Sequence, residues 1–94
     1  MIIKVKKYAG TFAENKDVAR DIRINQIVPA LRKSKTVILD FTDVSGATQS
    51  FVHALISDVI RHYGDDVYDR LLFKNCSPIV QEVVSIVAEY MHES

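Results

Sequence analysis

The sequence predicts a small α/β domain in which helices pack on a mixed or mostly parallel sheet. A short run of apolar and β-branched residues, Thr36 to Phe41, is typical of a buried strand. The segments on both sides of it repeat apolar residues at helical spacing. A second apolar run, Arg70 to Lys74, follows the next helix, and strands separated by a helix of this length pair in parallel through a right-handed crossover.

Size and composition indicate one soluble globular domain that spans residues 1–94. The chain has 94 residues, of which 48% are hydrophobic and 26% charged, as in ordinary globular proteins. Its 12 basic and 12 acidic residues cancel. Non-specific electrostatic binding to nucleic acid or to an anionic membrane is therefore disfavoured, because such binding requires a basic surface.

The cellular compartment is suggested by the cysteine count and by the apolar runs. Cys76 is the only cysteine, so no internal disulfide forms. The N-terminus, MIIKVKK, lacks the apolar stretch of a signal peptide, and no run approaches the length of a membrane helix. We expect a cytoplasmic protein.

The first third of the chain predicts a strand, a short return strand and a helix. Met1 to Lys7 alternates weakly between apolar and lysine residues, which favours a strand with one wet face. Thr11 to Ala13 would return as a second strand and complete a hairpin. Asn15 can cap a helix over Lys16 to Lys33, and Pro29 predicts a kink within it.

A second helix is predicted from Ser50 to Tyr63, where Gly64 supplies a C-cap. Its core-facing residues recur at helical spacing, and the opposite face is expected to be wet. The predicted inward residues are Val52, Leu55, Ile56, Val59, Ile60 and Tyr63, and the outward ones are His53, Ser57 and Arg61.

The last predicted helix begins with Ser77 as N-cap and Pro78 at the first helical position, after a polar turn over Asp65 to Asp69 and the strand Arg70 to Lys74. The element order is thus β(β)αβαβα. The inward residues of the last helix are predicted to be Ile79, Val80, Val83, Val84, Val87 and Met91, and the outward ones Gln81, Ser85, Glu89 and His92.

Taken together, these segments resemble a known family. The segments that carry the resemblance are VILDFTDV, the Thr48-x-Ser50-Phe51 helix start, the run LLFKN, and Ser77-Pro78 before a valine-rich helix. They are similar to the bacterial STAS-like domains and, more distantly, to the STAS domains of sulfate transporters and anti-sigma-factor antagonists. The resemblance covers nearly the whole chain and rests on a pattern of strand, loop and helix.

The resemblance implies a regulatory protein-interaction module without enzymatic activity or cofactor. Anti-sigma-factor antagonists bind a kinase-like ATPase through the loop after the central strand and through the following helix, and phosphorylation at that helix N-terminus switches binding off. The family pattern there is roughly Asp-Ser-Ser-Gly, against Thr48-Gln49-Ser50-Phe51 here. The usual phosphoacceptor position holds Gln49, which leaves Ser50 and Thr48 as the candidate phosphoacceptors.

Each candidate site residue also has a structural interpretation. Ser50 or Thr48 can cap the helix without any further role. Asp40 and Asp43 at the end of the central strand suggest a receiver-type phosphotransfer site, but acidic partners from a second strand end are missing. Asp40 is therefore expected to bond backbone N–H groups of its loop. Gly46 is expected to serve a turn with positive φ.

The remaining reactive side chains predict no metal site and no nucleophile. His53, His62 and His92 lack metal-ligand spacing. Cys76 precedes a helix, which can lower a thiol pKa, but no base is identifiable for it, and a small residue in a strand-to-helix turn is the better interpretation.

The sequence thus predicts an interaction module whose partner is a protein, with a kinase-like ATPase implied by the resemblance. A regulatory binder of a nucleotide or small anion at the same helix N-terminus remains the alternative. Wide apolar stripes on the last two helices also allow a homodimer. The predicted partner-binding residues are Ser45, Gly46, Thr48, Gln49, Ser50, His53, Ser57 and Arg61.

Overall fold

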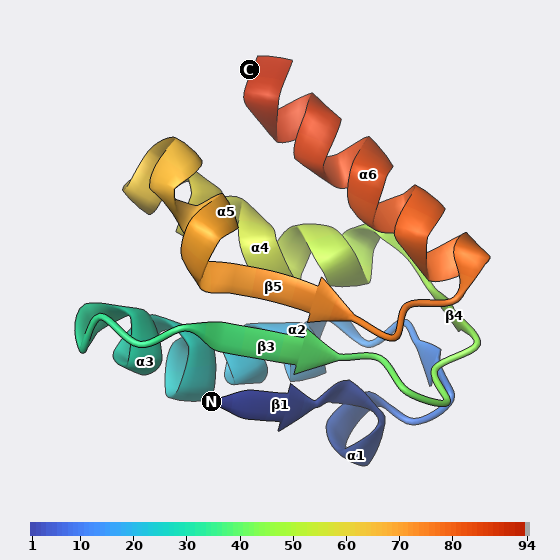
Figure 1. Cartoon of the computed structure of the whole chain (residues 1–94). Helices are drawn as coiled ribbons and strands as arrows, with labels where there is room; N and C mark the ends of the chain where they lie inside the picture. Colours follow the sequence, from blue (N-terminus) through green and yellow to red (C-terminus); the bar gives the residue numbers. More distant parts are fainter. Residues whose placement is uncertain (94) are drawn as a thin grey trace.

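The computed structural model in Figure 1 describes the backbone of residues 1–93 and the side chains in that range except those of residues 65, 92 and 93. The elements in chain order are β1 (Ile2–Lys4), α1 (Val5–Ala9), β2 (Phe12–Ala13), α2 (Lys16–Ile22), the π-helix η1 (Arg23–Ile27), α3 (Val28–Arg32), β3 (Val37–Asp40), β4 (Gly46–Ala47), α4 (Gln49–Tyr63), the 3-10 helix η2 (Gly64–Asp66), α5 (Val67–Arg70), β5 (Leu71–Lys74) and α6 (Pro78–Glu93).

Two parallel sheets confirm the predicted fold class. The larger sheet has the order β1-β3-β5, and β2 pairs with β4 in a second sheet of two strands. In the larger sheet Ile2 lies opposite Ile38, and Ile38 lies opposite Leu72. Two residues further along the strands, Lys4, Asp40 and Lys74 form the corresponding row. The apolar run at the centre of the sequence is therefore the middle strand, as predicted.

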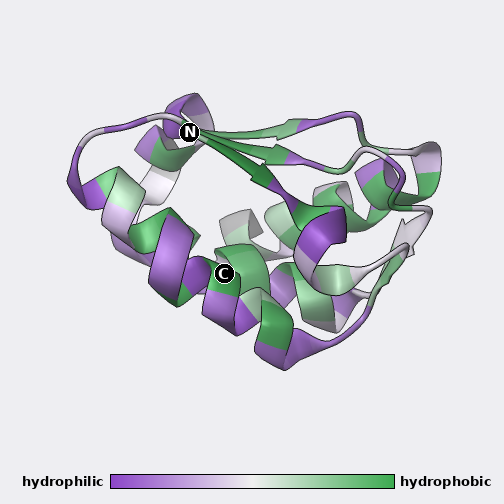
Figure 2. Ribbon diagram, turned by 90° about the horizontal axis from the view of Figure 1, so that it is seen from below, coloured by the Kyte–Doolittle hydropathy of each residue, from purple (hydrophilic) through white to green (hydrophobic). Residues whose placement is uncertain are grey.

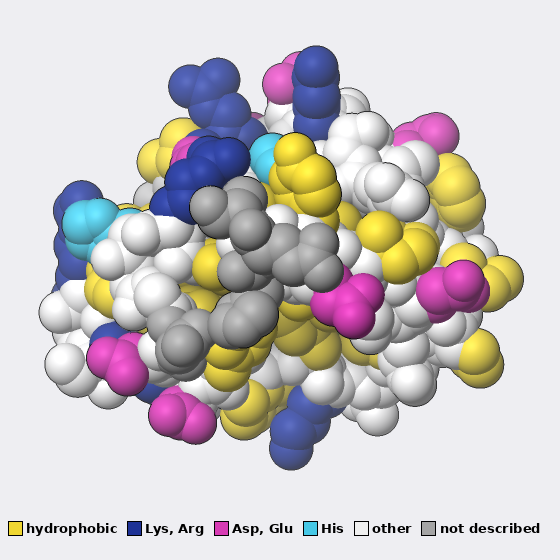
Figure 3. Space-filling model, turned by 90° about the horizontal axis from the view of Figure 1, so that it is seen from above, with side chains coloured by type: hydrophobic (Ala, Val, Ile, Leu, Met, Phe, Trp, Pro, Cys, Tyr) yellow, Lys and Arg dark blue, Asp and Glu magenta, His cyan; other side chains and the backbone are white. Residues whose placement is uncertain are grey.

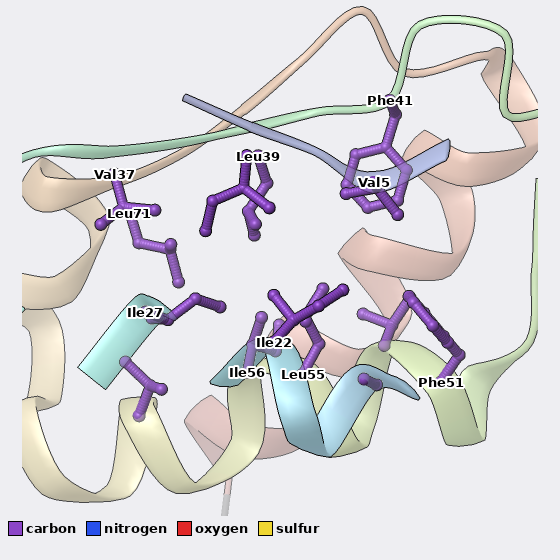
Figure 4. Close-up of a cluster of buried hydrophobic side chains, with 14 of the residues drawn as sticks. Val5, Ile22, Ile27, Val37, Leu39, Phe41, Phe51, Leu55, Ile56 and Leu71 are labelled. Atoms are coloured by element: carbon purple, nitrogen blue, oxygen red, sulfur yellow. The ribbon is translucent and has the colours of Figure 1, made fainter. Parts of the chain in front are cut away.

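Among the residues that the structure describes, helices cover one face of the larger sheet and leave the other open (Figure 2). Figure 2 shows the three strands as one layer with the helices on one side of it. Val37, Leu39 and Leu71 point to that side, where they meet Ile22 from α2 and Leu55 from α4 (Figure 4). All five side chains are buried. The hydrophobic core therefore lies between the sheet and the helix layer.

The helix α4 occupies the middle of the helix layer, between α2 and α6. Ser57 is only 3% exposed, so the prediction that it lies on a wet face is wrong. Ser57 is buried because α2 and η1 cover one flank of α4. The Arg23 side chain extends from η1 to α4, and its Nη1 donates to the Ala54 carbonyl at 2.8 Å and lies 3.2 Å from Asp58 Oδ2. A helix covered on both flanks buries more of its circumference than its apolar stripe predicts.

The N-terminal segment differs from the predicted hairpin. The strand ends at Lys4, and α1 follows with Val5 fully buried and Gly10 after its last residue at φ 78°. An alternating pattern of so few residues cannot separate the two conformations, since both place Val5 in the core. The return strand β2 exists, but it pairs in parallel with β4 rather than with β1.

The predicted helix over Lys16 to Lys33 is confirmed as the continuous run α2, η1 and α3, which ends at Arg32. Asn15 caps it, because its Oδ1 accepts hydrogen bonds from the N–H groups of Asp17 and Val18. Pro29 lies in the first turn of α3, directly after the π-helix. A proline removes one backbone donor, and a π-turn is one way for a helix to accommodate that loss.

The last helix runs as predicted from Pro78, with the Ser77 hydroxyl accepting a hydrogen bond from the Val80 N–H at 3.3 Å. Val80, Val87 and Met91 are buried, but Ile79 is 60% exposed and does not face inward as predicted. Val80 occupies the core-facing direction, and a neighbouring residue on a helix points about 100° away. The side chain of His92, predicted to face outward, lies outside the described residues.

Candidate functional site

The N-terminus of α4 is capped by Thr48 rather than by Ser50. The Thr48 side-chain oxygen accepts a hydrogen bond from the Phe51 N–H at 3.1 Å, and its backbone is extended, as expected of an N-cap. Gln49 and Ser50 are the first two helical residues, and both side chains are exposed. The capping alternative is therefore confirmed for Thr48, and Ser50 has an exposed hydroxyl beside the positive end of the helix dipole.

An apolar groove lies beside this helix start, between α4 and α6. Its volume is about 490 Å³. Figure 3, which views the molecule from the side that carries α6, shows hydrophobic side chains at the surface among acidic ones. The groove is lined by Lys16, Gln49, Ser50, His53, Ala54, Ile86, Val87 and Tyr90.

The groove joins residues that the sequence singled out with residues that it did not. Gln49, Ser50 and half-buried His53 were predicted, and they form the polar wall. Ile86 and Tyr90 form the opposite wall and are 41% and 64% exposed. They were missed because neither belongs to the core-facing residues of the last helix, and only the helix packing shows that they face Ser50.

Ser45 and Gly46 lie apart from the groove. The Ser45 hydroxyl donates to the Thr11 carbonyl at 3.0 Å, and Gly46 is buried in β4. Gly46 does not have positive φ, so that prediction is wrong. Its role is close approach, because a Cβ at this position would lie 2.9 Å from the Phe12 ring.

Arg61 is also distant from the groove, near the C-terminus of α4. Its Nη1 donates to Asp58 Oδ1 at 3.0 Å, and both side chains are more than half exposed. Ser57, one turn before it, is buried. The predicted surface thus contains one compact part, Gln49 to His53, and several residues that the fold separates from it.

The carboxyl edge of the larger sheet holds a polar network around Asp40. Its Oδ1 accepts hydrogen bonds from the Thr42 hydroxyl at 2.6 Å, the Thr42 N–H at 2.9 Å and the Asn75 side chain at 3.1 Å. These hydrogen bonds, with the charge of Lys4, lower the pKa of Asp40 below its usual value. The expectation that Asp40 bonds backbone N–H groups of its loop is confirmed.

A second cavity, of about 480 Å³, lies at the same sheet edge. Three lysines contribute to it, and Lys6 Nζ lies 4.0 Å from Asp43 Oδ2. Neither Asp40 nor Asp43 is joined there by a carboxylate from another strand end. The cavity is lined by Lys4, Lys6, Lys7, Asp40, Thr42 and Asp43.

Cys76 lies in the loop between β5 and α6 and is half-buried. Burial raises the pKa of its thiol, and the Asp40 charge raises this pKa further. A raised pKa disfavours the thiolate that a nucleophile needs. Among the described side chains no group of three or more His, Cys, Asp and Glu is placed to hold a metal ion. No helix in the described part of the chain is both long and apolar enough to cross a membrane.

Comparison with known proteins places the chain in a family. Residues 18–81 match the family model described as STAS-like domain of unknown function (DUF4325). The chain belongs to this family. The STAS-like match extends from α2 through the first turn of α6 and so includes the whole α4 wall of the groove. Searches of curated proteins and of solved structures found no match.

Proposed function

We propose that this STAS-like domain is a non-enzymatic regulatory module that binds a protein partner in the groove between the start of α4 and α6. The observation that carries this function is the position of Gln49, Ser50 and His53 opposite the exposed Ile86 and Tyr90. Interfaces between proteins typically place aromatic and aliphatic anchors at the centre and polar groups around them. The groove combines apolar anchors and polar groups within one small area of the surface.

The family resemblance suggests the kind of partner. In anti-sigma-factor antagonists the loop after the central strand and the following helix contact a kinase-like ATPase. The equivalent segment here begins at Thr48 and forms the polar wall of the groove. A kinase-like ATPase is therefore the partner class that we favour, and the domain itself supplies a surface rather than catalytic groups.

Ser50 is the favoured position for control by phosphorylation. Its hydroxyl is exposed at the groove, whereas the Thr48 oxygen is engaged in the helix cap. A phosphate on Ser50 would add about −2 charges beside the helix N-terminus. Such a group would change the polar wall of the groove without requiring the fold to change.

Affinity capture from the native cells tests this function. Wild type is compared with Ser50→Arg and Tyr90→Asp, which obstruct opposite walls of the groove. The matched control is Arg61→Ala, an exposed residue on the same helix away from the groove. We expect one protein to be retained by wild type and the control and lost from both groove variants. Equal retention by all four, with every variant folded, would contradict the proposed site.

The alternative ligand, a nucleotide or small anion, makes a different prediction. The groove volume of about 490 Å³ falls within the range of small-molecule sites, and Lys16 and the start of α4 offer positive charge. Binding of ATP or inorganic phosphate would raise the melting temperature of the purified protein, and the rise would be lost in Ser50→Glu, whose carboxylate repels the anion. A partner lost from the groove variants without such a shift favours the interaction module.

A further inference from the structure

The open face of the larger sheet carries an apolar row that no described element covers. Ile2 is 63% exposed, and Ile38 and Leu72 beside it are half-buried. Their neighbours along the strands, Ile3 and Leu39, point into the core. Sheets made only of parallel strands are usually covered on both faces, with helices as the covering layer. In the described part of the chain, this sheet has a helix layer on one side only (Figure 2).

The next row of the same face is charged. Lys4 and Lys74 flank Asp40 in the strand register and lie two residues beyond Ile2 and Leu72. Because residues two apart on a strand share a face, the apolar row is bordered by lysines. An occupant of this face should therefore present an apolar stripe with acidic side chains beside it. We call the two rows the acceptor face.

The exposed side of α6 has this chemistry. Ile79, Ile86 and Tyr90 are spaced by seven and four residues, so they form one stripe, and all three are exposed. Glu82 and Glu89 each follow an isoleucine of the stripe by three residues and form an adjacent acidic stripe. Figure 3 shows hydrophobic and acidic side chains side by side on this part of the surface. We call this side of α6 the donor stripe.

We propose that the donor stripe of one copy packs on the acceptor face of a second copy and completes a helix–sheet–helix sandwich between chains. Ile79, Ile86 and Tyr90 would cover the apolar row, and Glu82 and Glu89 would approach Lys4 and Lys74. The two surfaces differ, so the contact is heterologous and joins molecules head to tail. The contact goes beyond the proposed partner binding, and it competes with it because Ile86 and Tyr90 also line the groove.

The charge distribution along the chain supports a second copy as the occupant. Residues 1–35 hold nine of the 12 basic residues and three of the 12 acidic ones, so the other 59 residues carry the opposite excess. The two surfaces of the contact carry opposite charges, with Lys4 and Lys74 on the acceptor face and Glu82 and Glu89 beside the donor stripe, and such surfaces attract each other in complementary orientation. High salt should weaken the contact by screening the exposed charges.

Sedimentation of the purified chain tests the pairing directly. The weight-average mass is measured from about 5 μM to about 1 mM, a range suited to weak interfaces. The acceptor variant is Lys4→Glu with Lys74→Glu, and the donor variant is Glu82→Lys with Glu89→Lys; all four side chains are exposed. A control with the same net charge as the acceptor variant is Arg20→Glu with Arg32→Glu, and circular dichroism checks the folding of each.

We expect the mass of wild type and the control to rise above 10.6 kDa with concentration and to return to it in about 0.5 M NaCl. The acceptor and donor variants should each associate at least about tenfold more weakly. Mixing them, or combining all four substitutions in one chain, should restore association because both charge rows are then reversed. A monomeric wild type throughout, association unaffected by either reversal, or failure of the combined variant to associate would each overturn the pairing.

Discussion

Thr48 and Phe51 are joined by the hydrogen bond that begins α4: the Phe51 N–H donates to the Thr48 side-chain oxygen at 3.1 Å. This bond fixes where the helix starts. It also leaves Ser50, two residues later, with an exposed hydroxyl at the groove. The two hydroxyl residues therefore differ in role: the Thr48 oxygen caps the helix, whereas the Ser50 hydroxyl is exposed to solvent.

The capping role predicts unequal effects of two similar substitutions. Thr48→Ala should lower the free energy of unfolding by about 1 kcal/mol, because the Phe51 N–H loses its partner. Thr48→Ser should retain most of the stability. Ser50→Ala, on the exposed first turn, should change it by less than about 0.5 kcal/mol. Urea unfolding at neutral pH measures all three, and equal losses for Thr48→Ala and Ser50→Ala would refute the assignment.

The burial of Ser57 predicts that the site does not tolerate a large side chain. Ser57 lies on the covered circumference of α4 and is 3% exposed. Ser57→Leu should therefore destabilise the domain by about 1–3 kcal/mol through overpacking. If Ser57 were exposed, as its place in the helical pattern suggests, the same substitution would be nearly neutral. The change in denaturation midpoint separates the two cases.

Arg23 and Arg61 both contact Asp58, but they should differ in their effect on stability. The Arg23 side chain is 15% exposed and also donates to the Ala54 carbonyl, whereas Arg61 is 60% exposed. Arg23→Ala should cost about 1.5–3 kcal/mol, as for a hydrogen bond from a charged donor. Arg61→Ala should cost at most about 1 kcal/mol, as for surface ion pairs. Thermal unfolding of the two variants provides the comparison, and similar losses would contradict it.

Asp40 predicts a pH-dependent contribution to stability. Hydrogen bonds from Thr42 and Asn75 lower its pKa in the folded state, so the ionised carboxylate favours folding. This contribution is present above the unfolded pKa of about 3.9 and is lost as the pH falls through the lower folded value. Wild type and Asp40→Asn should therefore converge in stability as the pH falls below the folded-state pKa of Asp40.

A side-chain NMR titration gives the direct check on Asp40. Its midpoint should lie below the unfolded value of about 3.9. The control for the comparison of stability with Asp40→Asn is Glu14→Gln, which removes an exposed carboxylate elsewhere on the surface. A titration midpoint above about 4 for Asp40 would show that the hydrogen bonds to Thr42 and Asn75 do not stabilise the ionised form.

The sequence predicts the fold well where long apolar patterns decide it. The strand at Val37–Asp40, the helix that ends before Gly64 and the helix that starts at Pro78 all follow from local patterns of apolar, capping and turn residues. The N-terminal hairpin was wrong because β2 pairs with β4, more than thirty residues away, and such pairing leaves no local signal. Tertiary contacts determine which strand a segment of only two residues pairs with.

The candidate site was predictable only in part, for a related reason. Gln49, Ser50 and His53 were found because a helix start after a central strand is a recurrent position for sites. Ser57 was misplaced because Arg23 and α2 cover a flank of α4 that its own sequence presents as polar. Ile86 and Tyr90 were missed because the second wall of the groove comes from another helix, whose position depends on packing across α4.

The central claim, that a partner occupies the groove, is tested most directly by cross-linking in the native cells. A photoreactive amino acid is placed at Gln49 or Tyr90 on opposite walls, and at Asp69 and Arg20, exposed positions outside the groove, as controls. Mass spectrometry then identifies the covalent adducts. We predict that both groove positions give an adduct with the same protein and that neither control position does. Adducts with that protein from the controls alone, or no adduct from either groove position, would contradict the account.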